Sequence, residues 1–375
     1  MKKVVIAIDS FKGCLPSVEA GKAAAEGIRS VYPECEVICL PIADGGEGML
    51  DVLIMATNGQ EVPISAHDPL MRWRNTYYGI SENGETAFIE MASISGLPLV
   101  PPGRRTPMLT TTYGTGEIIR DALERGCRNF IIGIGGSATN DAGLGMLQAL
   151  GFRFSDKEGK EVGTGRGEVL IKVAHIDSTC VHPALNSCRF TVACDVQNPF
   201  YGPEGAAYVF APQKGANRKM VEALDAGLQN FAEVIRHTTG KDISHHPGAG
   251  AAGGMGGSLL AFLNAELKPG IQLMLEALDF SNKIKSADLI ITGEGKADRQ
   301  TLMGKVPSGI LAEARKQNIP VILLAGNIED SDELQQAGFE GVFSVNPPFI
   351  SLEEAMRPEV ARKNIQQTVE SICKK

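Results

Sequence analysis

Short apolar runs with few polar residues inside them recur at both ends of this chain. Residues 3–9 (KVVIAID) and 36–42 (EVICLPI) lie near the start, and residues 287–293 (ADLIITG) and 320–326 (PVILLAG) lie near the end. Strands that are apolar on both faces are typical of a parallel sheet covered by helices on both sides. We therefore expect an α/β fold whose first domain takes its strands from both ends of the chain.

Segments with helical spacing of apolar residues separate these strands. Residues 17–32 form one such segment, and Pro358 should interrupt the helical pattern of residues 351–375. Regular alternation of strand and helix is typical of parallel sheets. It predicts a Rossmann-like or flavodoxin-like parallel-sheet domain made of residues 1–66 and 285–375.

The middle of the chain has a different pattern. Residues 60–66, 74–80 and 85–91 are strand-like and lie close together, which predicts antiparallel hairpins. Residues 218–240 have the spacing of a long amphipathic helix. A chain of 375 residues is also too long for one ordinary core. We expect a second, inserted mixed α/β domain over residues 67–284.

Charge and composition argue against several classes of partner. The formal net charge is −8 and no basic tract stands out, so we expect neither nucleic acid nor a membrane as a partner. The first apolar run is too short for a signal peptide, and no run approaches the length of a membrane helix. The eight cysteines form no C-x-x-C pair. Together these features favour a cytoplasmic protein with reduced core cysteines.

Clusters of polar residues and glycines follow five of the expected strands. In open α/β sheets, small ligands bind at the edge formed by the carboxyl ends of the strands. One such cluster is usually a turn or a helix cap, but five of them predict a ligand site. They are residues 9–13 (DSFKG), 43–48 (ADGGEG), 133–141 (GIGGSATND), 194–199 (CDVQNP) and 292–298 (TGEGKAD).

The cluster at residues 133–141 is the best candidate for binding phosphate. Its glycines leave backbone N–H groups free, its short polar side chains add donors, and a helix should begin near Asp141. The spacing also meets the loose G-x-G-x-x-A pattern of dinucleotide-binding proteins. That alternative needs an acidic residue about twenty residues further on, and Asp156 there lies in a segment that is typical of a turn.

A second glycine-rich segment covers residues 248–257 (GAGAAGGMGG). Its small residues could line a nucleotide pocket or allow close packing of a helix, and the sequence leaves both interpretations open. No G-x-x-x-x-G-K-[ST] motif is present. A site for ATP would therefore lie outside the P-loop class.

Three carboxylates and one lysine lie in these clusters, and two further lysines lie next to glycines in the segments APQKGA (211–216) and GKVPSG (304–309). Phosphoryl transfer needs a carboxylate to hold Mg²⁺, often one to accept the hydroxyl proton, and cations on the transferring phosphate. Each lysine taken alone is more often a solvated surface amine. The residues are Asp44, Asp195, Glu294, Lys12, Lys305 and Lys214.

The motifs taken together resemble those of the bacterial type-1 glycerate kinase family. They are AIDSFKG, ADGGEG, GGSATND, CDVQNP with GAAYVFAPQKGA, PGAGAAGGMGG and TGEGKADRQTLMGK, in this order along nearly the whole chain. The resemblance implies ATP-dependent phosphorylation of D-glycerate to 2-phosphoglycerate, with ATP and Mg²⁺. It also implies two α/β domains with the active site in the cleft between them.

The resemblance leads to a hypothesis for each site residue. Asp195 would be the general base or a Mg²⁺ ligand, with Asp44 as a second ligand for the metal. Lys12 would neutralise the transferring phosphate or the glycerate carboxylate, and Glu294 completes the catalytic set. The substrate-binding residues would be Ser10, Asn198 and Lys305. The nucleotide-binding residues would be Gly135, Gly136, Ser137, Thr139, Asn140, Gly253 and Gly254.

Other functions stay open at this point. The same kinase could form 3-phosphoglycerate, because no motif distinguishes the two hydroxyl groups of glycerate. An NAD-dependent dehydrogenase of a small hydroxy acid and a non-catalytic small-anion binding protein are further alternatives. The sequence also leaves the oligomeric state open, a homodimer included.

Overall fold

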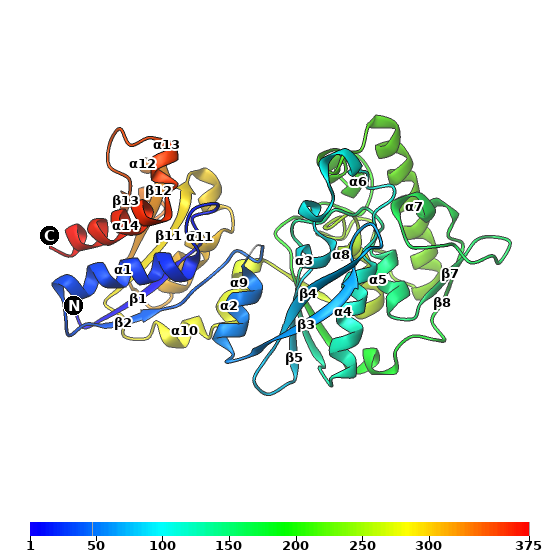
Figure 1. Ribbon diagram of the computed structural model, residues 1–375, viewed down its shortest axis with the longest axis horizontal. Helices are drawn as coiled ribbons and strands as arrows, with labels where there is room; N and C mark the ends of the chain where they lie inside the picture. The colour runs from blue at the N-terminus through cyan, green and yellow to red at the C-terminus, as the bar shows by residue number, and fades with distance from the viewer. Residues whose placement is uncertain (47, 375) are drawn as a thin grey trace. The chain divides into compact units, whose positions relative to one another are not determined.

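The computed structural model describes residues 1–46 and 48–374. Glu47, in the cluster at residues 43–48, and Lys375 lie outside the described residues. The chain divides into two compact units (Figure 1). The first unit consists of Met1–Asp44 and Ile271–Lys375, and the second of Gly45–Gly270. The expected α/β fold with a parallel sheet drawn from both ends of the chain is confirmed.

The first unit is built on a parallel five-stranded sheet with the order β13-β12-β11-β1-β2. The chain passes from β1 to β2 on one side and later adds β11, β12 and β13 on the other side. The strand order therefore reverses between β1 and β11. The strands are β1 (Lys3–Ile8), β2 (Glu36–Cys39), β11 (Leu289–Ala297), β12 (Val321–Ile328) and β13 (Gly341–Ser344).

Helices cover both faces of this sheet. Val4, Ile6 and Ile8, which alternate along β1, share a core cluster with residues of α1 (Ser17–Val31) and α14 (Pro358–Cys373). These two helices lie side by side in Figure 1. Since α11 contacts β1, β11 and β12, it covers the opposite face. The other helices are α9 (Gly270–Ala277), α10 (Phe280–Lys283), η6 (Arg299–Leu302), α11 (Val306–Arg315), α12 (Ser331–Gln336) and α13 (Leu352–Ala355).

Pro358 interrupts the C-terminal helical pattern as predicted. Helix α13 ends at Ala355, and α14 begins at Pro358 itself. Proline suits the first position of a helix, because its missing N–H would have no partner there and its φ angle is already helical.

The second unit contains a six-stranded mixed sheet with the order β10-β9-β6-β5-β4-β3. The β10, β9, β6 and β5 strands are parallel, whereas β3 and β4 form the predicted antiparallel hairpin and β4 runs antiparallel to β5. A separate two-stranded sheet pairs β7 with β8. The strands are β3 (Gln60–His67), β4 (Trp73–Ile80), β5 (Thr86–Glu90), β6 (Asn129–Gly133), β7 (Arg153–Ser155), β8 (His175–Asp177), β9 (Arg189–Ala193) and β10 (Glu266–Lys268).

One large apolar cluster fills the second unit. It includes the stacked rings of Phe130 and Phe190, 4.7 Å apart on adjacent strands. Helix α7 is the long amphipathic helix that the sequence predicted, and Asn217 caps its start. The α-helices are α2 (Met49–Ala56), α3 (Ala92–Ser95), α4 (Tyr113–Glu124), α5 (Leu144–Ala149), α6 (Ala206–Phe210), α7 (Arg218–Thr239) and α8 (Met255–Leu263). The 3₁₀ helices are η1 (Leu97–Leu99), η2 (Pro102–Arg104), η3 (Gly167–Lys172), η4 (Pro183–Ser187) and η5 (Pro212–Lys214).

The unit boundaries differ from those expected at residues 66 and 284. Residues 45–66 lie in the second unit, because β3 pairs along its whole length with β4 and α2 contacts β4 and β5. Residues 271–284 lie in the first unit. There the side chain of Ile271 is close to Gly309 of α11.

All eight cysteines are free thiols. Four of them are buried as expected, but Cys180 is exposed, so it is not a core cysteine. None of the helices in the described residues is long and apolar enough to cross a membrane.

Candidate active site

Two buried carboxylates stand next to each other where the strand order of the first unit reverses. Asp9 directly follows β1, and its N–H donates to the carbonyl oxygen of Gly293 at 2.9 Å, one residue before Glu294. Glu294 lies inside β11, opposite Ala325 of β12, rather than after the strand as the sequence suggested. A reversal of strand order at the carboxyl edge is where open α/β sheets bind ligands.

Asp9, the first residue of the predicted cluster at residues 9–13, has an environment that is unusual for a carboxylate. It is 6% exposed, and burial raises its pKa to about 7, with the negative charge of Asp44 as the next cause. Its Oδ1 accepts a hydrogen bond from the N–H of Ser10 at 2.7 Å. The sequence indicated this position, because a carboxylate directly after a fully apolar strand lies at the carboxyl edge of the sheet.

Lys12 is held beside Asp44 by the turn after β1. The N–H of Phe11 donates to Leu15 across this turn, and the Nζ of Lys12 lies 3.2 Å from Oδ2 of Asp44. Burial alone would lower the pKa of Lys12, but Asp44 and then the carboxylate of Asp9 raise it above its ordinary value. Lys12 therefore carries a positive charge at neutral pH. Its side chain is 64% exposed, so this charge is also accessible.

Glu294 has a similar cationic neighbour. Its Oε1 accepts a hydrogen bond from Oγ1 of Thr301 at 2.5 Å, and Nζ of Lys305 lies 3.7 Å from its Oε2. Burial raises the pKa of Glu294 above its ordinary value, although Thr301 and Lys305 act in the opposite direction. Lys305 is the residue before α11 begins, so the start of that helix fixes its backbone.

These side chains line one cavity of about 350 Å³ within the first unit. The structure thus brings together all five site residues that the sequence predicted in this unit. A cavity of this size suits a small-molecule ligand. Its polar lining includes Asp9, Ser10, Lys12, Asp44, Glu294 and Lys305, and its apolar lining includes Phe11, Val345 and Met356.

A second group of predicted residues forms a loop after β6 in the second unit. We call residues 135–140 the 135–140 loop. Gly135 and Gly136 are exposed, whereas Ser137, Thr139 and Asn140 are buried. Gly136 has a φ of +70°, a conformation that favours glycine.

The helix after this loop begins later than predicted. Helix α5 begins at Leu144, and the buried carboxylate of Asp141 accepts hydrogen bonds from the N–H groups of Gly143, just before the helix, and of Gly145, in its first turn. The same carboxylate accepts two bonds from Thr112, through its N–H and its Oγ1, both at 2.8 Å. Asp141 therefore fixes the end of the loop.

Two side chains of the 135–140 loop contain buried polar atoms without partners. They are Oγ1 of Thr139 and both amide atoms of Asn140, none of which has a hydrogen-bond partner in the described part of the chain. Buried polar groups are nearly always paired with protein or with ordered water. Unpaired atoms at a predicted ligand loop therefore fit a site that water or a ligand completes.

The glycines of the second glycine-rich segment support this loop by close packing. Gly253 has a φ of +68°, and a Cβ atom there would lie 2.1 Å from the carbonyl oxygen of Thr139. A Cβ on Gly254 would lie 3.1 Å from Cα of Ala142. Of the two interpretations that the sequence left open, these contacts favour packing for both glycines.

Asp195 and Asn198, the remaining predicted residues, both make contacts with the backbone. Asp195 is exposed, and its Oδ1 accepts a hydrogen bond from the N–H of Gly270, the first residue of α9, at 2.8 Å. The side chain of Asn198 donates to the carbonyl oxygen of Glu204 at 2.8 Å. Each residue therefore has a structural contact, whatever its role in chemistry.

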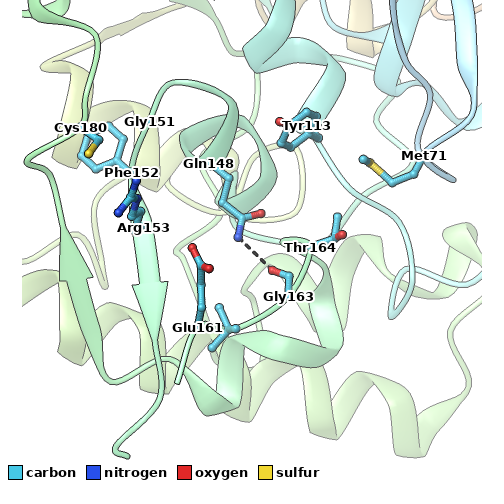
Figure 2. Close-up of a pocket in the computed structure, with 11 residues that line it drawn as sticks. Met71, Tyr113, Gln148, Gly151, Phe152, Arg153, Glu161, Gly163, Thr164 and Cys180 are labelled. Carbon is cyan, nitrogen blue, oxygen red and sulfur yellow. Dashed lines mark hydrogen bonds between the residues drawn. The ribbon is translucent and has the colours of Figure 1, made fainter. Parts of the chain in front are cut away.

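A cavity of about 510 Å³ elsewhere in the second unit contains none of the predicted site residues (Figure 2). Gln148, in its wall, donates through Nε2 to the carbonyl oxygen of Gly163 at 2.9 Å, the bond drawn in Figure 2. Its Oε1 accepts from the N–H of Gly165 at 2.6 Å. The amide of Gln148 is thus already used by the protein.

The described residues contain no group of three or more His, Cys, Asp or Glu side chains that could hold a metal ion by themselves.

Lysines beside carboxylates at the carboxyl edge of a parallel sheet are the kind of arrangement that a phosphotransferase uses. Residues 4–375 match the model of the Glycerate kinase family. The chain belongs to the glycerate kinase family, which confirms the resemblance.

Individual relatives align with this chain over nearly their whole length. The chain is 46% identical to "Glycerate kinase" of Bacillus subtilis, over 99% of this chain and 97% of that one. It is 47% identical to "Glycerate 2-kinase" of Escherichia coli, over 95% and 93%. A crystal structure from Salmonella typhimurium LT2, provisionally assigned as glycerate kinase 2, has a TM-score of 0.91 and 44% identity, over 100% of this chain and 97% of that one.

Proposed function

We propose that this chain transfers the γ-phosphoryl group of ATP to the 2-hydroxyl of D-glycerate, giving 2-phosphoglycerate and ADP. Membership of the family, together with relatives of matching length, supports the reaction class. The name "Glycerate 2-kinase" of the Escherichia coli relative supports the choice of hydroxyl.

The observation that carries this proposal is the placement of Lys12 with Asp44, and of Lys305 with Glu294, around one cavity. Phosphoryl transfer depends mostly on positioning and on stabilising charge at the transferring group. Lys12 is charged, accessible and fixed by its turn. It is therefore suited to neutralise either the phosphate or the carboxylate of glycerate.

Asp195 remains our proposal for the general base or for a Mg²⁺ ligand. Its side chain is exposed, and its Oδ1 accepts a hydrogen bond from the N–H of Gly270. Asp44 is proposed as a second ligand for Mg²⁺. The metal, when bound to ATP, supplies positive charge at the phosphate oxygens. Ser10, Asn198 and Lys305 are proposed to bind substrate.

The 135–140 loop is proposed to bind the phosphates of ATP. Its exposed glycines and its unpaired buried polar atoms support this role. Gly253 is proposed to act through the loop, since a Cβ there would meet its backbone, and Gly254 through Ala142, Leu228 and Phe200, which a Cβ there would meet.

The proposal is tested by following the product of D-glycerate, ATP and Mg²⁺ by ³¹P and ¹³C NMR. We expect glycerate-dependent formation of ADP and a phosphate coupled to carbon 2. A phosphate on carbon 3 would replace the proposed product with 3-phosphoglycerate. ADP formed equally without glycerate, or no ADP at all, would contradict the proposed reaction.

A further inference from the structure

Lys214 is a buried lysine that the sequence could not distinguish from a surface amine. It is the last residue of η5, and it is 3% exposed. Its Nζ donates to Oγ of Ser137 at 2.7 Å and to the carbonyl oxygen of Thr139 at 2.6 Å. The amine is thus bonded to the 135–140 loop from the interior of the second unit.

The charge of this amine is poorly compensated by the protein. An ammonium group has three N–H donors, and the two bonds to the loop use two of them. Burial lowers the pKa of Lys214 to about 7, and the carboxylate of Asp141 is the charged group that opposes this effect. Asp141 is itself buried and already accepts bonds from Thr112, Gly143 and Gly145. Near neutral pH, Lys214 is therefore charged in only part of the molecules.

The outer side of the loop offers hydrogen-bond donors. Since Oγ of Ser137 accepts a bond from Lys214, its own hydroxyl proton is available to another acceptor. The N–H groups of Gly135, Gly136 and Ser137 donate to no other group within residues 1–46 and 48–374. Several available donors with a positive charge behind them match an anion.

The number of donors favours phosphate over carboxylate. A phosphate group carries more negative charge than a carboxylate and has three strong acceptor oxygens. Several N–H groups and a hydroxyl can be used at once by such a group. Of the two proposed substrates, ATP carries phosphates, whereas D-glycerate carries one carboxylate.

We propose that Lys214 is a positioning residue of an anion site on the 135–140 loop, where it supplies the charge that holds the phosphate chain of the nucleotide. The choice of nucleotide rests on the proposed kinase function. A bound phosphate favours the charged form of Lys214, so binding should transfer a proton from solvent to Nζ. No other bond is made or broken in this step.

The first test compares Lys214→Met with Lys219→Met, the same substitution at an exposed lysine five residues further on. Methionine fills a similar volume without the charge. We expect the KM for ATP of Lys214→Met to rise by about 10- to 100-fold, the effect of losing one charged interaction, with the KM for glycerate unchanged. Lys219→Met should leave both values unchanged.

Protein stability is read together with the KM for ATP. Methionine removes an amine whose burial is unfavourable but leaves Oγ of Ser137 and the carbonyl oxygen of Thr139 without their donor, so a change in Tm by itself does not decide between the two roles. A lower Tm together with an unchanged KM for ATP would overturn the proposal. A rise in the KM for glycerate alone would also overturn it, because the anion would then be the substrate carboxylate.

The second test measures the proton directly. Binding of inorganic tripolyphosphate is followed by titration calorimetry at pH 7 in two buffers with different ionisation enthalpies. We expect uptake of part of a proton by the wild type, because burial lowers the pKa of Lys214 to about 7, and clearly less uptake by Lys214→Met. Equal uptake by both proteins would overturn the assignment of the proton to Lys214.

The calorimetry does not depend on the kinase reaction. If the wild type forms no ADP with glycerate but binds tripolyphosphate through Lys214, the anion site stands and the proposed function fails. If the wild type forms ADP with glycerate and Lys214→Met behaves as the wild type in both tests, the function stands and the proposal for Lys214 fails.

Discussion

Asp195 has a structural contact and a proposed catalytic role. Its Oδ1 accepts a hydrogen bond at the start of α9, so its removal could act on structure as well as on chemistry. Asparagine keeps an acceptor oxygen at this position but cannot accept the proton of a substrate hydroxyl. The choice of substitution therefore separates the two roles.

We expect Asp195→Asn to lower kcat by about 10²- to 10⁴-fold, the range typical of a lost general base, with little change in Tm. Asp195→Ala should lower kcat to a similar extent and also lower Tm. Steady-state kinetics and thermal unfolding on the same preparations provide the measurement. Turnover near the wild-type value in a folded Asp195→Asn variant would show that Asp195 is not the base.

Asp9 gives a prediction about pH. The pKa of its carboxyl rises from an ordinary value of 3.8 to about 7 in the folded protein. Between these values the folded state keeps a proton that the unfolded chain loses. The stability that this proton provides is present at low pH and is lost as the pH rises towards 7, by at most about 1.4 kcal/mol per pH unit.

We expect Asp9→Asn, whose side chain stays neutral, to lose less stability than the wild type between pH 5 and pH 7. Urea unfolding at several pH values measures the free energy of unfolding. Asp332→Asn, at an exposed position, is the control and should follow the wild type. An unchanged slope in Asp9→Asn would mean that other groups cause the pH dependence.

The site residues that follow the first two strands could be predicted to lie together. Ser10, Lys12 and Asp44 follow the first two strands, and parallel strands end at the same edge of a sheet, so the pattern was sufficient to group them. Lys214 could not be predicted in this way. Its burial depends on bonds to residues 75 and 77 positions earlier, and no local pattern reports such a contact.

At the scale of elements, α1 and α14 pack so closely that one position requires glycine. A Cβ atom on Gly27 of α1 would lie 2.5 Å from the carbonyl oxygen of Gln366 in α14. A Cβ on Gly21, in the same helix, would have its nearest neighbours at 3.9 Å, an ordinary contact. The two glycines therefore lie in the same helix, but only Gly27 is in close contact with α14.

We therefore expect opposite effects from the same substitution. Gly27→Ala should destabilise the protein by about 1–3 kcal/mol, the typical cost of overpacking. Gly21→Ala should be neutral or should stabilise it by up to about 1 kcal/mol, since alanine is the better helix former. Urea unfolding measures both. A stabilising Gly27→Ala would contradict the close contact between the helices.

The periodicity of apolar residues predicted most helices and strands, but it did not predict where some of them end. Strand β11 continues to Ala297 because residues up to Ala297 pair with β12 through backbone bonds. Its last residues, GEGKA, have the composition of a turn. Likewise α5 begins late, and the buried side chain of Asp141 accepts N–H bonds at its start. The spacing of apolar side chains says little about where backbone pairing continues or where a buried side chain caps a helix.

At the scale of the molecule, each of the two units has an apolar cluster of its own among the described residues, which predicts two unfolding steps. Trp73 is the single tryptophan of the chain and lies on β4, in the second unit. Its ring is 4.0 Å from that of His67. Unfolding of the second unit should therefore change its fluorescence, whereas far-UV circular dichroism reports helices of both units.

We expect Ile365→Ala, in the core of the first unit, to lower the stability of that unit by about 2–5 kcal/mol. The circular dichroism curve should then begin to change at lower urea, while the midpoint of Trp73 fluorescence stays in place. Leu228→Ala, in the core of the second unit, is the matched variant and should shift the fluorescence. Equal shifts of fluorescence in both variants would mean that the chain unfolds in one step.

The division of the chain was predictable in outline. The apolar runs at the two ends showed that the first domain is discontinuous. The units divide at residues 44 and 270 instead of 66 and 284, because β3 pairs with β4 and the side chain of Ile271 packs against Gly309 of α11. Only such contacts decide the assignment.

The discontinuous first unit also has a consequence for how the protein is made. During synthesis β1 can pair at once with β2, but its other edge has to wait for β11, which follows the whole of residues 45–270. At roughly 5–20 residues per second, that wait is about 10–45 s. An unpaired apolar strand edge is prone to aggregate. The first segment to leave the ribosome is therefore among the last to be completed, and chaperones have time to bind it.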